Sequence, residues 1–109
     1  MKDNILYEKP FVGDRECIVI ADDFFKDSPA VFSGCPVIYL HAGEEEKDFA
    51  SVERIIGRLA DLGADRSTFL IGMGGGITTD ITGFVASIYK RGLDFGLVPT
   101  TLLARWMQP

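Results

Sequence analysis

Four short apolar runs lie along the chain, and each stops at a polar or glycine-rich segment. They cover residues 18–21, 37–40, 69–71 and 95–98. The runs are apolar throughout, whereas a strand with one wet face would alternate apolar and polar positions. The pattern therefore predicts four strands that are buried on both faces, as in a parallel sheet.

A different periodicity fills the space between the second and third runs. There, apolar residues recur at steps of three and four, which predicts a helix with one apolar face. This face consists of Phe49, Val52, Ile55, Ile56, Leu59 and Leu62. Acidic residues at 44–46 and 48 stand at the start of the segment, where the helix dipole favours anions. Gly63 fits the position just beyond its end.

The same periodicity predicts a second helix after the third run, with an apolar face formed by Ile77, Ile81, Phe84, Val85 and Ile88. Lys90 and Arg91 fall in its last turn, and Gly92 follows as the exit residue. The segment 23–32 predicts a short helix that is interrupted near its proline. Residues 3–13 predict an extended lead-in to the first strand.

Alternating strands and helices predict an α/β fold, namely a Rossmann-like parallel sheet with helices on both faces. Ligands of such sheets bind beyond the carboxyl ends of the strands. The polar residues at these ends are Asp22 and Asp23, Gly43 and Glu44 with Lys47, the glycines 74–76 with Asp80, and Thr100 and Thr101. We expect all of them to face one crevice.

Composition narrows the class of protein and of partner. The 109 residues make one domain, and 47% hydrophobic with 25% charged residues is typical of a globular chain. The net charge of −5 offers no basic stripe for a phosphate backbone, so we expect no nucleic-acid partner. No apolar run is long enough for a membrane span, and the first ten residues lack the apolar core of a signal peptide. We therefore expect a cytoplasmic protein without membrane contact.

Cys17, Cys35 and His41 could change this picture through their chemistry. The two cysteines show neither a CxxC spacing nor a secretory context, so we interpret them as small buried hydrophobes that are not bonded to each other. A catalytic zinc site usually takes about three protein ligands, which a chain with one histidine can hardly supply. We expect His41 to end a strand and face solvent, and we expect no metal site in this chain.

Gly74–Gly76 is the strongest local signal, because it follows a predicted strand and opens a predicted helix. Residues without a Cβ let backbone N–H groups approach an anion, and a helix N-terminus favours negative charge. A pyrophosphate is the natural ligand, although Ile77 stands where the common G-x-G-x-x-G fingerprint has glycine. A tight strand-to-helix turn without a ligand is the alternative interpretation.

The other polar residues at these strand ends each have two interpretations. Asp22 could bind ribose hydroxyls or cap a helix, and Asp80 could accept hydrogen bonds from a ligand or only complement the helix dipole. Lys47 could reach a phosphate or lie on a solvated helix face. Thr100 and Thr101 could offer hydroxyls to a ligand or form the N-cap of a following helix.

Taken together, these residues resemble the N-terminal domain of the 3-dehydroquinate synthase family. The resemblance is dense over residues 63–104 and thinner over residues 16–62. It rests on Gly63–Ser67, Ile71–Gly76, Asp80, Gly83–Ala86, Tyr89, Arg91–Gly92 and Pro99–Ala104. The stretch from Gly43 to Lys47 is similar to the family's G-E-x-x-K element. Related sugar-phosphate cyclases share most of this pattern.

The resemblance implies NAD as a recycled cofactor of a lyase in the shikimate pathway of aromatic amino-acid biosynthesis. This enzyme converts 3-deoxy-arabino-heptulosonate 7-phosphate to 3-dehydroquinate with loss of phosphate. The implied cofactor-binding residues are Asp22, Glu44, Lys47, Gly74, Gly75, Gly76, Thr79, Asp80, Thr100 and Thr101. Asp22 and Glu44 would contact the adenosine ribose side, and Asp80 would lie near the nicotinamide. Arg91 would bind substrate phosphate in the site of a homodimer partner.

The length of the second predicted helix supports this role of Arg91 in trans. A helix from Gly76 to Lys90 would be about 22 Å long. A guanidinium reaches only about 6–7 Å from its Cα, roughly the length of two extended residues. Arg91 would therefore lie too far from the glycine loop to serve the site of its own chain. An arginine that only complements the helix C-terminus is the alternative.

The resemblance has limits within these 109 residues. Thr79 stands where the family usually has glycine, and Ala42 stands where an acidic residue is common. The tail 105–109 departs from the family pattern, and the family's C-terminal helical domain, which binds a divalent zinc or cobalt ion, is absent. We therefore expect residues 1–104 to form an NAD-binding domain that is inactive alone and self-associates through its bare contact surface. The alternatives are a related sugar-phosphate cyclase, a metal-dependent polyol dehydrogenase and a non-catalytic nucleotide-binding or assembly module.

Overall fold

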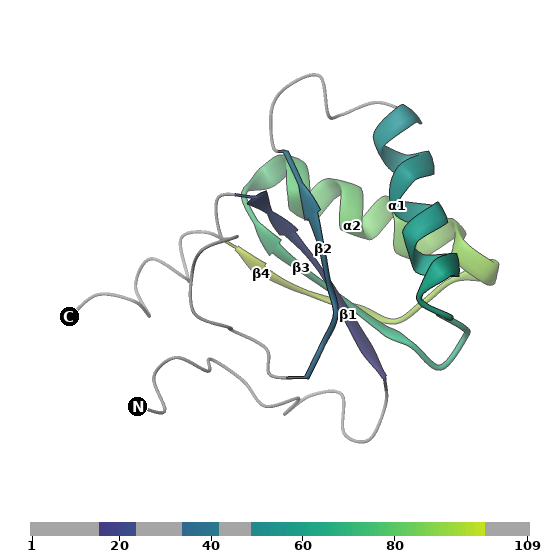
Figure 1. Ribbon diagram of the computed structural model, residues 1–109. Coiled ribbons are helices and arrows are strands. Elements are labelled where there is room, and N and C mark those ends of the chain that lie inside the picture. The colour runs from purple at the N-terminus through teal and green to yellow at the C-terminus, as the bar shows by residue number, and fades with distance from the viewer. Residues whose placement is uncertain (1–15, 24–33, 42–48, 100–109) are drawn as a thin grey trace.

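A computed structural model describes residues 16–23, 34–41 and 49–99 of the chain. Four strands form one parallel sheet (Figure 1): β1 (Cys17–Asp22), β2 (Val37–Leu40), β3 (Phe69–Gly74) and β4 (Phe95–Pro99). Their order across the sheet is β2-β1-β3-β4, so β1 and β3 are central. The four predicted strands and the parallel α/β fold are confirmed. The predicted burial on both faces holds for the central strands β1 and β3, but it is wrong for the outer strands, because β2 is fully buried only at alternate positions and β4 is mostly exposed.

The register aligns the ends of neighbouring strands. Asp22 of β1 pairs with Leu40 of β2, and Gly74 of β3 pairs with Pro99 of β4. All four strands therefore end at one side of the sheet, which we call the carboxyl edge. The opposite side, where the strands begin, is the amino edge.

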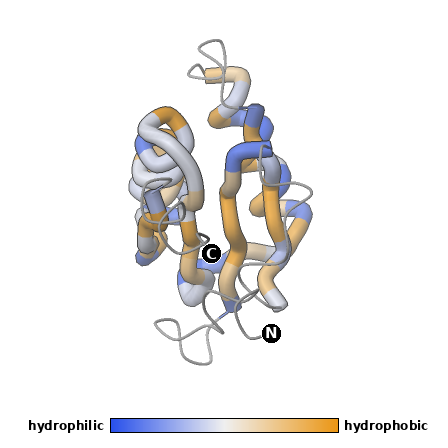
Figure 2. The backbone as a smooth tube through the Cα atoms, turned by 90° about the vertical axis from the view of Figure 1, so that its left-hand side faces the viewer, coloured by the Kyte–Doolittle hydropathy of each residue, from blue (hydrophilic) through white to orange (hydrophobic). Residues whose placement is uncertain are grey.

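Both described helices, α1 (Phe49–Asp61) and α2 (Gly76–Ile88), cover the same face of the sheet. The core on this face includes Ile18, Ile20, Ile38, Leu40, Ile55, Leu59, Leu70, Ile81, Val85 and Ala86. The opposite face carries Cys17, Val19, Ala21, Cys35, Phe69, Ile71, Met73 and Val98. Figure 2 shows long hydrophobic stretches along the strands of the sheet.

The expected helices on both faces are only partly tested. Within the described residues, no helix covers the second face. The helix expected over residues 23–32 lies outside the described residues apart from Asp23, and so does the lead-in expected over residues 3–13. The described part of the chain contains no helix that is long and apolar enough to cross a membrane.

The buried face of α2 differs from the predicted one. Ile81 and Val85 are buried as expected, but Phe84 and Ile88 are each 47% exposed. The helix packs instead through smaller neighbours, which are Thr78, Thr82 and Ala86. Gly72 of β3 explains this, because a Cβ there would lie 2.7 Å from the Cβ of Thr82. The glycine thus lets the threonine side of α2 approach the sheet closely.

The apolar face predicted for α1 is right in its middle and wrong at its ends. Ile55 and Leu59 are fully buried, whereas Phe49 is 80% exposed and Leu62 is 40% exposed. Gly63 has φ +78° and closes the helix as predicted, because its N–H bonds to the carbonyl of Ala60. The N–H of Ala64 bonds to the carbonyl of Leu59, which completes a Schellman motif.

The second helix ends two residues earlier than predicted. After Ile88 the chain forms a 3₁₀-helix over Tyr89–Arg91, in which Lys90 and Arg91 have positive φ angles of 45° and 72°. Left-handed backbone cannot continue an α-helix, so these two cations follow α2 instead of lying in its last turn. Gly92 is the exit residue as predicted, and its N–H bonds to the carbonyl of Tyr89 at 2.8 Å.

Cys17 and Cys35 form a disulfide, so the expectation of two unbonded cysteines is wrong. Both are buried as expected, with exposed fractions of 2% and 9%. Val19 pairs with Val37, and this register places Cys35 opposite Cys17. Their Cα atoms are 5.4 Å apart, which suits a disulfide. The separation of 18 residues gives no hint of the bond, because the pairing of β1 with β2 creates the contact.

Candidate functional site

The carboxyl edge brings together predicted site residues from β1 and β3. Asp22 ends β1, Gly74 ends β3, and Gly75 is the N-cap of α2, which begins at Gly76. The remaining strand-end candidates are Glu44, Lys47, Thr100 and Thr101, and these lie outside the described residues. Their place at this edge stays a prediction.

The glycine loop is tight on one side and open on the other. Gly74 has φ +154°, and a Cβ on it would lie 2.5 Å from Oδ1 of Asp22. Gly75 has an extended conformation and offers no side chain that could cap α2. Among the described residues, no heavy atom outside the adjacent residues and the backbone of α2 lies within 4 Å of the place where a Cβ of Gly76 would stand. A ligand therefore finds open space at the first turn of α2.

The Asp22 carboxylate links the end of β1 to the start of α2. Its Oδ1 accepts a hydrogen bond from the hydroxyl of Thr78, a fully buried residue 56 positions away in the sequence. Its Oδ2 accepts a longer hydrogen bond of 3.4 Å from the N–H of Gly75. This contact ties the end of β1 to the first turn of α2, but no side chain caps α2 at Gly75, so the helix cap expected of Asp22 stays a prediction. Contact with ribose stays a prediction.

Thr79 and Asp80 follow on α2. The hydroxyl of Thr79 lies 3.1 Å from the carbonyl oxygens of Gly75 and Gly76, so it donates back into the first turn of its own helix. This local bonding shows how the helix accommodates a threonine at this position. Asp80 is exposed on the same helix, and its contact with a ligand stays a prediction.

A second polar contact at the carboxyl edge joins Asp23 to His41. Nδ1 of His41 lies 3.1 Å from Oδ2 of Asp23, and the two side chains are 66% and 42% exposed. His41 follows β2 and faces solvent, as predicted.

Neither the pairing of His41 nor the bond of Thr78 was predicted from the sequence. Signals for both were present. Residues that follow neighbouring parallel strands meet at one edge, and Thr78 precedes Ile81 by three positions, on the buried side of the predicted helix.

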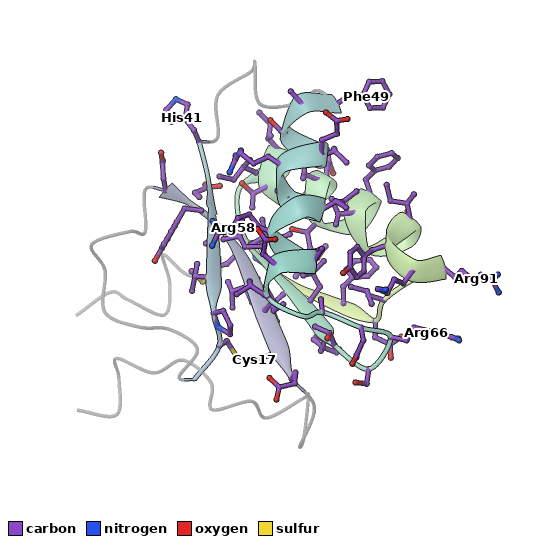
Figure 3. All side chains as sticks on the ribbon, turned by 45° about the vertical axis from the view of Figure 1, so that its right-hand side comes forward. Cys17, His41, Phe49, Arg58, Arg66 and Arg91 are labelled. Carbon is purple, nitrogen blue, oxygen red and sulfur yellow. A yellow bond between two sulfur atoms is a disulfide. The ribbon has the colours of Figure 1, made fainter. Side chains whose placement is uncertain are left out.

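Arg91 lies at the opposite end of α2 from the glycine loop, and its exposed side chain points away from the sheet (Figure 3). The 13 residues of α2 span about 20 Å. This length of α2 is shorter than expected because the helix ends earlier, but it still exceeds the reach of an arginine side chain.

The described residues of the carboxyl edge suit an anionic ligand better than a metal ion. Within residues 16–23, 34–41 and 49–99, no group of three or more His, Cys, Asp or Glu side chains could hold a metal. The first N–H groups of an α-helix have no acceptor within the helix. Together with the open position at Gly76, they can receive a phosphate oxygen.

Comparison with known proteins identifies the family. The model of the 3-dehydroquinate synthase N-terminal domain matches residues 37–107. The chain is 56% identical over 63 residues to the 3-dehydroquinate synthase of Pyrococcus furiosus and 51% identical over 69 residues to that of Dictyoglomus thermophilum. These alignments cover 58% and 63% of the chain. A longer alignment, with the synthase of Coxiella burnetii, covers 94% of the chain at 38% identity. The chain spans 19% of the first two relatives and 32% of the third.

Solved structures with the same fold include two sugar-phosphate cyclases and a probable glycerol dehydrogenase from Sinorhizobium meliloti. A 2-deoxy-scyllo-inosose synthase, complexed with carbaglucose-6-phosphate, NAD+ and Co2+, has a TM-score of 0.64 at 28% identity over 79% of the chain and 26% of its own. The 2-epi-5-epi-valiolone synthase of Streptomyces hygroscopicus, with NAD+ and Zn2+ bound, has a TM-score of 0.65 at 26% identity over 84% of the chain and 29% of its own. The resemblance drawn from the sequence is thereby confirmed, and the chain belongs to the 3-dehydroquinate synthase family, where it matches the N-terminal domain.

Proposed function

We propose that the chain supplies the NAD-binding domain of a 3-dehydroquinate synthase, which converts 3-deoxy-arabino-heptulosonate 7-phosphate to 3-dehydroquinate with loss of phosphate. The observation that carries this proposal is the open glycine loop at the N-terminus of α2, within the segment that matches the family. A related sugar-phosphate cyclase is the second candidate, because two such enzymes share the fold. An identity of 38% to a synthase over 94% of the chain, against 28% and 26% to these cyclases over 79% and 84% of it, favours the synthase.

The open side of the loop fits the diphosphate of NAD. Gly76 leaves room for phosphate oxygens to reach the backbone, and the start of α2 presents N–H groups and a positive dipole end. The residues that would complete the site are Glu44, Lys47, Thr100 and Thr101, with Asp80 beside the nicotinamide. Bound NAD would supply the hydride acceptor for a substrate hydroxyl. The residues of the chain would bind and orient it.

Calorimetric titration of the chain with NAD tests this proposal. We expect weak binding, because one domain supplies only one wall of a cofactor pocket. Gly76→Val would place its Cβ in open space, so it should leave the fold intact and abolish binding by blocking the approach of the anion. Gly57→Val, at an equally open position on α1, is the matched control and should bind NAD like the wild type. Equal affinity of the Gly76→Val variant and the wild type would contradict the proposal.

We expect the chain by itself to have no synthase activity. It spans 19–32% of the curated synthases that it matches, so most of their length, with the groups that would orient the substrate and bind a metal ion, has no counterpart here. Release of inorganic phosphate from the heptulosonate phosphate, with NAD and Zn2+ added, measures this directly. Turnover above a protein-free control would overturn the expectation.

We place Arg91 at the substrate phosphate of a partner subunit, because α2 separates it from the glycine loop of its own chain. Its planar guanidinium suits phosphate oxygens. Self-association would also cover the exposed apolar side chains Phe84, Ile88, Phe95 and Leu97. Light scattering at high concentration should show a species larger than the monomer. Arg91→Ala should leave NAD affinity unchanged, and weaker NAD binding by this variant would place Arg91 in its own site.

A further inference from the structure

We propose that Asp22 and Thr78 together hold the glycine loop in the shape that receives its ligand, which makes Thr78 a positioning residue of the carboxyl edge. The identity of that ligand as NAD rests on the proposed function. The contact itself does not, because it joins residues of two described elements, β1 and α2.

One carboxylate fixes the loop at two points. Oδ1 of Asp22 accepts from the hydroxyl of Thr78, and Oδ2 accepts from the N–H of Gly75. These two donors flank Gly76, the open position where a ligand can approach the backbone. The end of β1 therefore sets where the first turn of α2 stands relative to the sheet.

The close approach of the Asp22 carboxylate to the backbone of Gly74 supports the same assignment independently. A Cβ on Gly74 would lie 2.5 Å from Oδ1 and 2.7 Å from Cγ of Asp22. The carboxylate thus packs against the backbone of the loop on its inner side, toward β1. An incoming anion is left with Gly76, where a Cβ would meet no atom of another described element within 4 Å.

Thr78 matters for ligand binding because Asp22 carries a negative charge close to the place where an anionic ligand would bind. The carboxylate as held already accepts from the N–H of Gly75, and without Thr78 it would also be free to compete with a phosphate for the next N–H groups of α2, since both are anions. The buried hydroxyl of Thr78 ties the carboxylate to the inner side of the loop. Without this hydroxyl, the carboxylate loses a hydrogen bond and is no longer held away from the place of the ligand.

Amide hydrogen exchange in the ligand-free chain tests the positioning directly. In Thr78→Val, which keeps the shape and removes the hydroxyl, we expect exchange of the Gly75 amide to accelerate by about tenfold, the size of one hydrogen bond to a charged group. Thr78→Ser restores the hydroxyl and should restore the wild-type rate. Thr82→Val is the matched control, because it removes an equally buried hydroxyl that bonds to the carbonyl of Thr78 and not to Asp22. It should leave the Gly75 rate unchanged.

A second pair of variants covers the case in which Thr78→Val does not fold. Asp22→Asn replaces one carboxylate oxygen by an amino group, so it can no longer accept from both Thr78 and Gly75. It should accelerate exchange at Gly75, whereas Asp23→Asn, on the neighbouring exposed carboxylate, should not. Unchanged Gly75 exchange in Asp22→Asn, or equal acceleration in Asp23→Asn, would overturn the proposal.

Titration of the same variants with NAD separates the two proposals. We expect Thr78→Val to bind NAD about tenfold more weakly, with affinity rescued in Thr78→Ser. If the wild type binds no NAD while exchange responds as expected, the positioning by Asp22 and Thr78 stands and the proposed cofactor fails. If the wild type binds NAD while exchange does not respond, the positioning fails and the proposed function stands.

Discussion

The two edges of the sheet are closed in different ways. At the amino edge the contacts are a disulfide, a buried hydrogen bond between residues 25 positions apart, and local bonds in the turn before β3. A disulfide joins Cys17 to Cys35, and the Tyr89 hydroxyl donates to the carbonyl of Ala64 at 3.1 Å. At the carboxyl edge, the side chain of Asp22 reaches across to a different element, and open space remains at Gly76.

This difference separates the groups that hold the fold from the groups that can bind a ligand. The turn before β3 illustrates the first kind, because Oδ1 of Asp65 accepts from both the N–H and the hydroxyl of Ser67, at 2.9 and 2.7 Å. The N–H of Asp65 in turn bonds to Oγ1 of Thr68. Groups satisfied in this way have little left to offer a ligand. Changes at the amino edge should therefore alter stability alone, and changes at the carboxyl edge should alter ligand binding.

Removal of the disulfide should have the largest effect on stability. A double variant with Cys17→Ala and Cys35→Ala loses a link between residues 18 positions apart, which should lower the free energy of unfolding by about 3 kcal/mol. Urea unfolding measures the loss. Reductant should destabilise the wild type and leave the double variant unchanged. NAD affinity measured below the unfolding transition should stay the same, and a weaker affinity would mean that the amino edge also shapes the site.

Gly74→Ala should have the next largest effect, at the carboxyl edge. Its Cβ would meet the Asp22 carboxylate on a backbone with φ +154°, so we expect a loss of about 1–3 kcal/mol in unfolding free energy together with weaker NAD binding. Gly76→Ala is the matched control in the same loop, where a Cβ meets no atom of another element in the described part of the chain within 4 Å, and its stability should stay near that of the wild type. Equal stability of the two variants would show that the loop is not packed against β1.

The strands were predictable because each is apolar throughout and bounded by polar residues, and the Schellman end of α1 was predictable from Gly63 alone. Contacts between remote segments were not. The exposure of Phe84 depends on how closely α2 approaches Gly72, and the disulfide depends on the register of β1 with β2. For the site, the place of the glycine loop followed from the alternation of strands and helices, because ligands of such folds bind beyond the carboxyl ends of the strands. The bond of Asp22 to Thr78 required the packed structure, because apolar periodicity does not say which buried hydroxyl meets which carboxylate.

Tyr89→Phe should cost about 1 kcal/mol of unfolding free energy, since it removes a buried hydrogen bond. Burial, followed by the negative charge of Asp65, raises the pKa of Tyr89 above its usual value of 10.0. The unfolded chain therefore ionises first as the pH rises. The contribution of Tyr89 is fully present below pH 10.0 and is lost as the pH rises through the higher pKa of the folded state. Thermal unfolding between pH 9 and pH 11 should show this loss in the wild type and a smaller one in Tyr89→Phe; equal slopes would contradict the assignment.

The smallest effect should come from the turn at Asp65. Hydrogen bonds from the hydroxyl and the N–H of Ser67 lower the pKa of Asp65 below its usual value of 3.8, with a smaller contribution from the charge of Lys90. This contribution to stability is therefore present above pH 3.8 and is lost as the pH falls through the lower pKa of the folded state.

Ser67→Ala removes the hydroxyl and keeps the N–H, so the pKa of Asp65 should move toward 3.8 without reaching it. Because the carboxylate is exposed, an NMR titration of its carboxyl carbon is the suitable measurement, and Ser87→Ala, which loses an exposed hydroxyl bonded to Phe84, is the control that should leave the midpoint unchanged. A titration midpoint of Asp65 that does not move in Ser67→Ala would show that the Ser67 hydroxyl does not hold the Asp65 carboxylate. NAD binding unchanged in both serine variants would keep the division between the two edges intact.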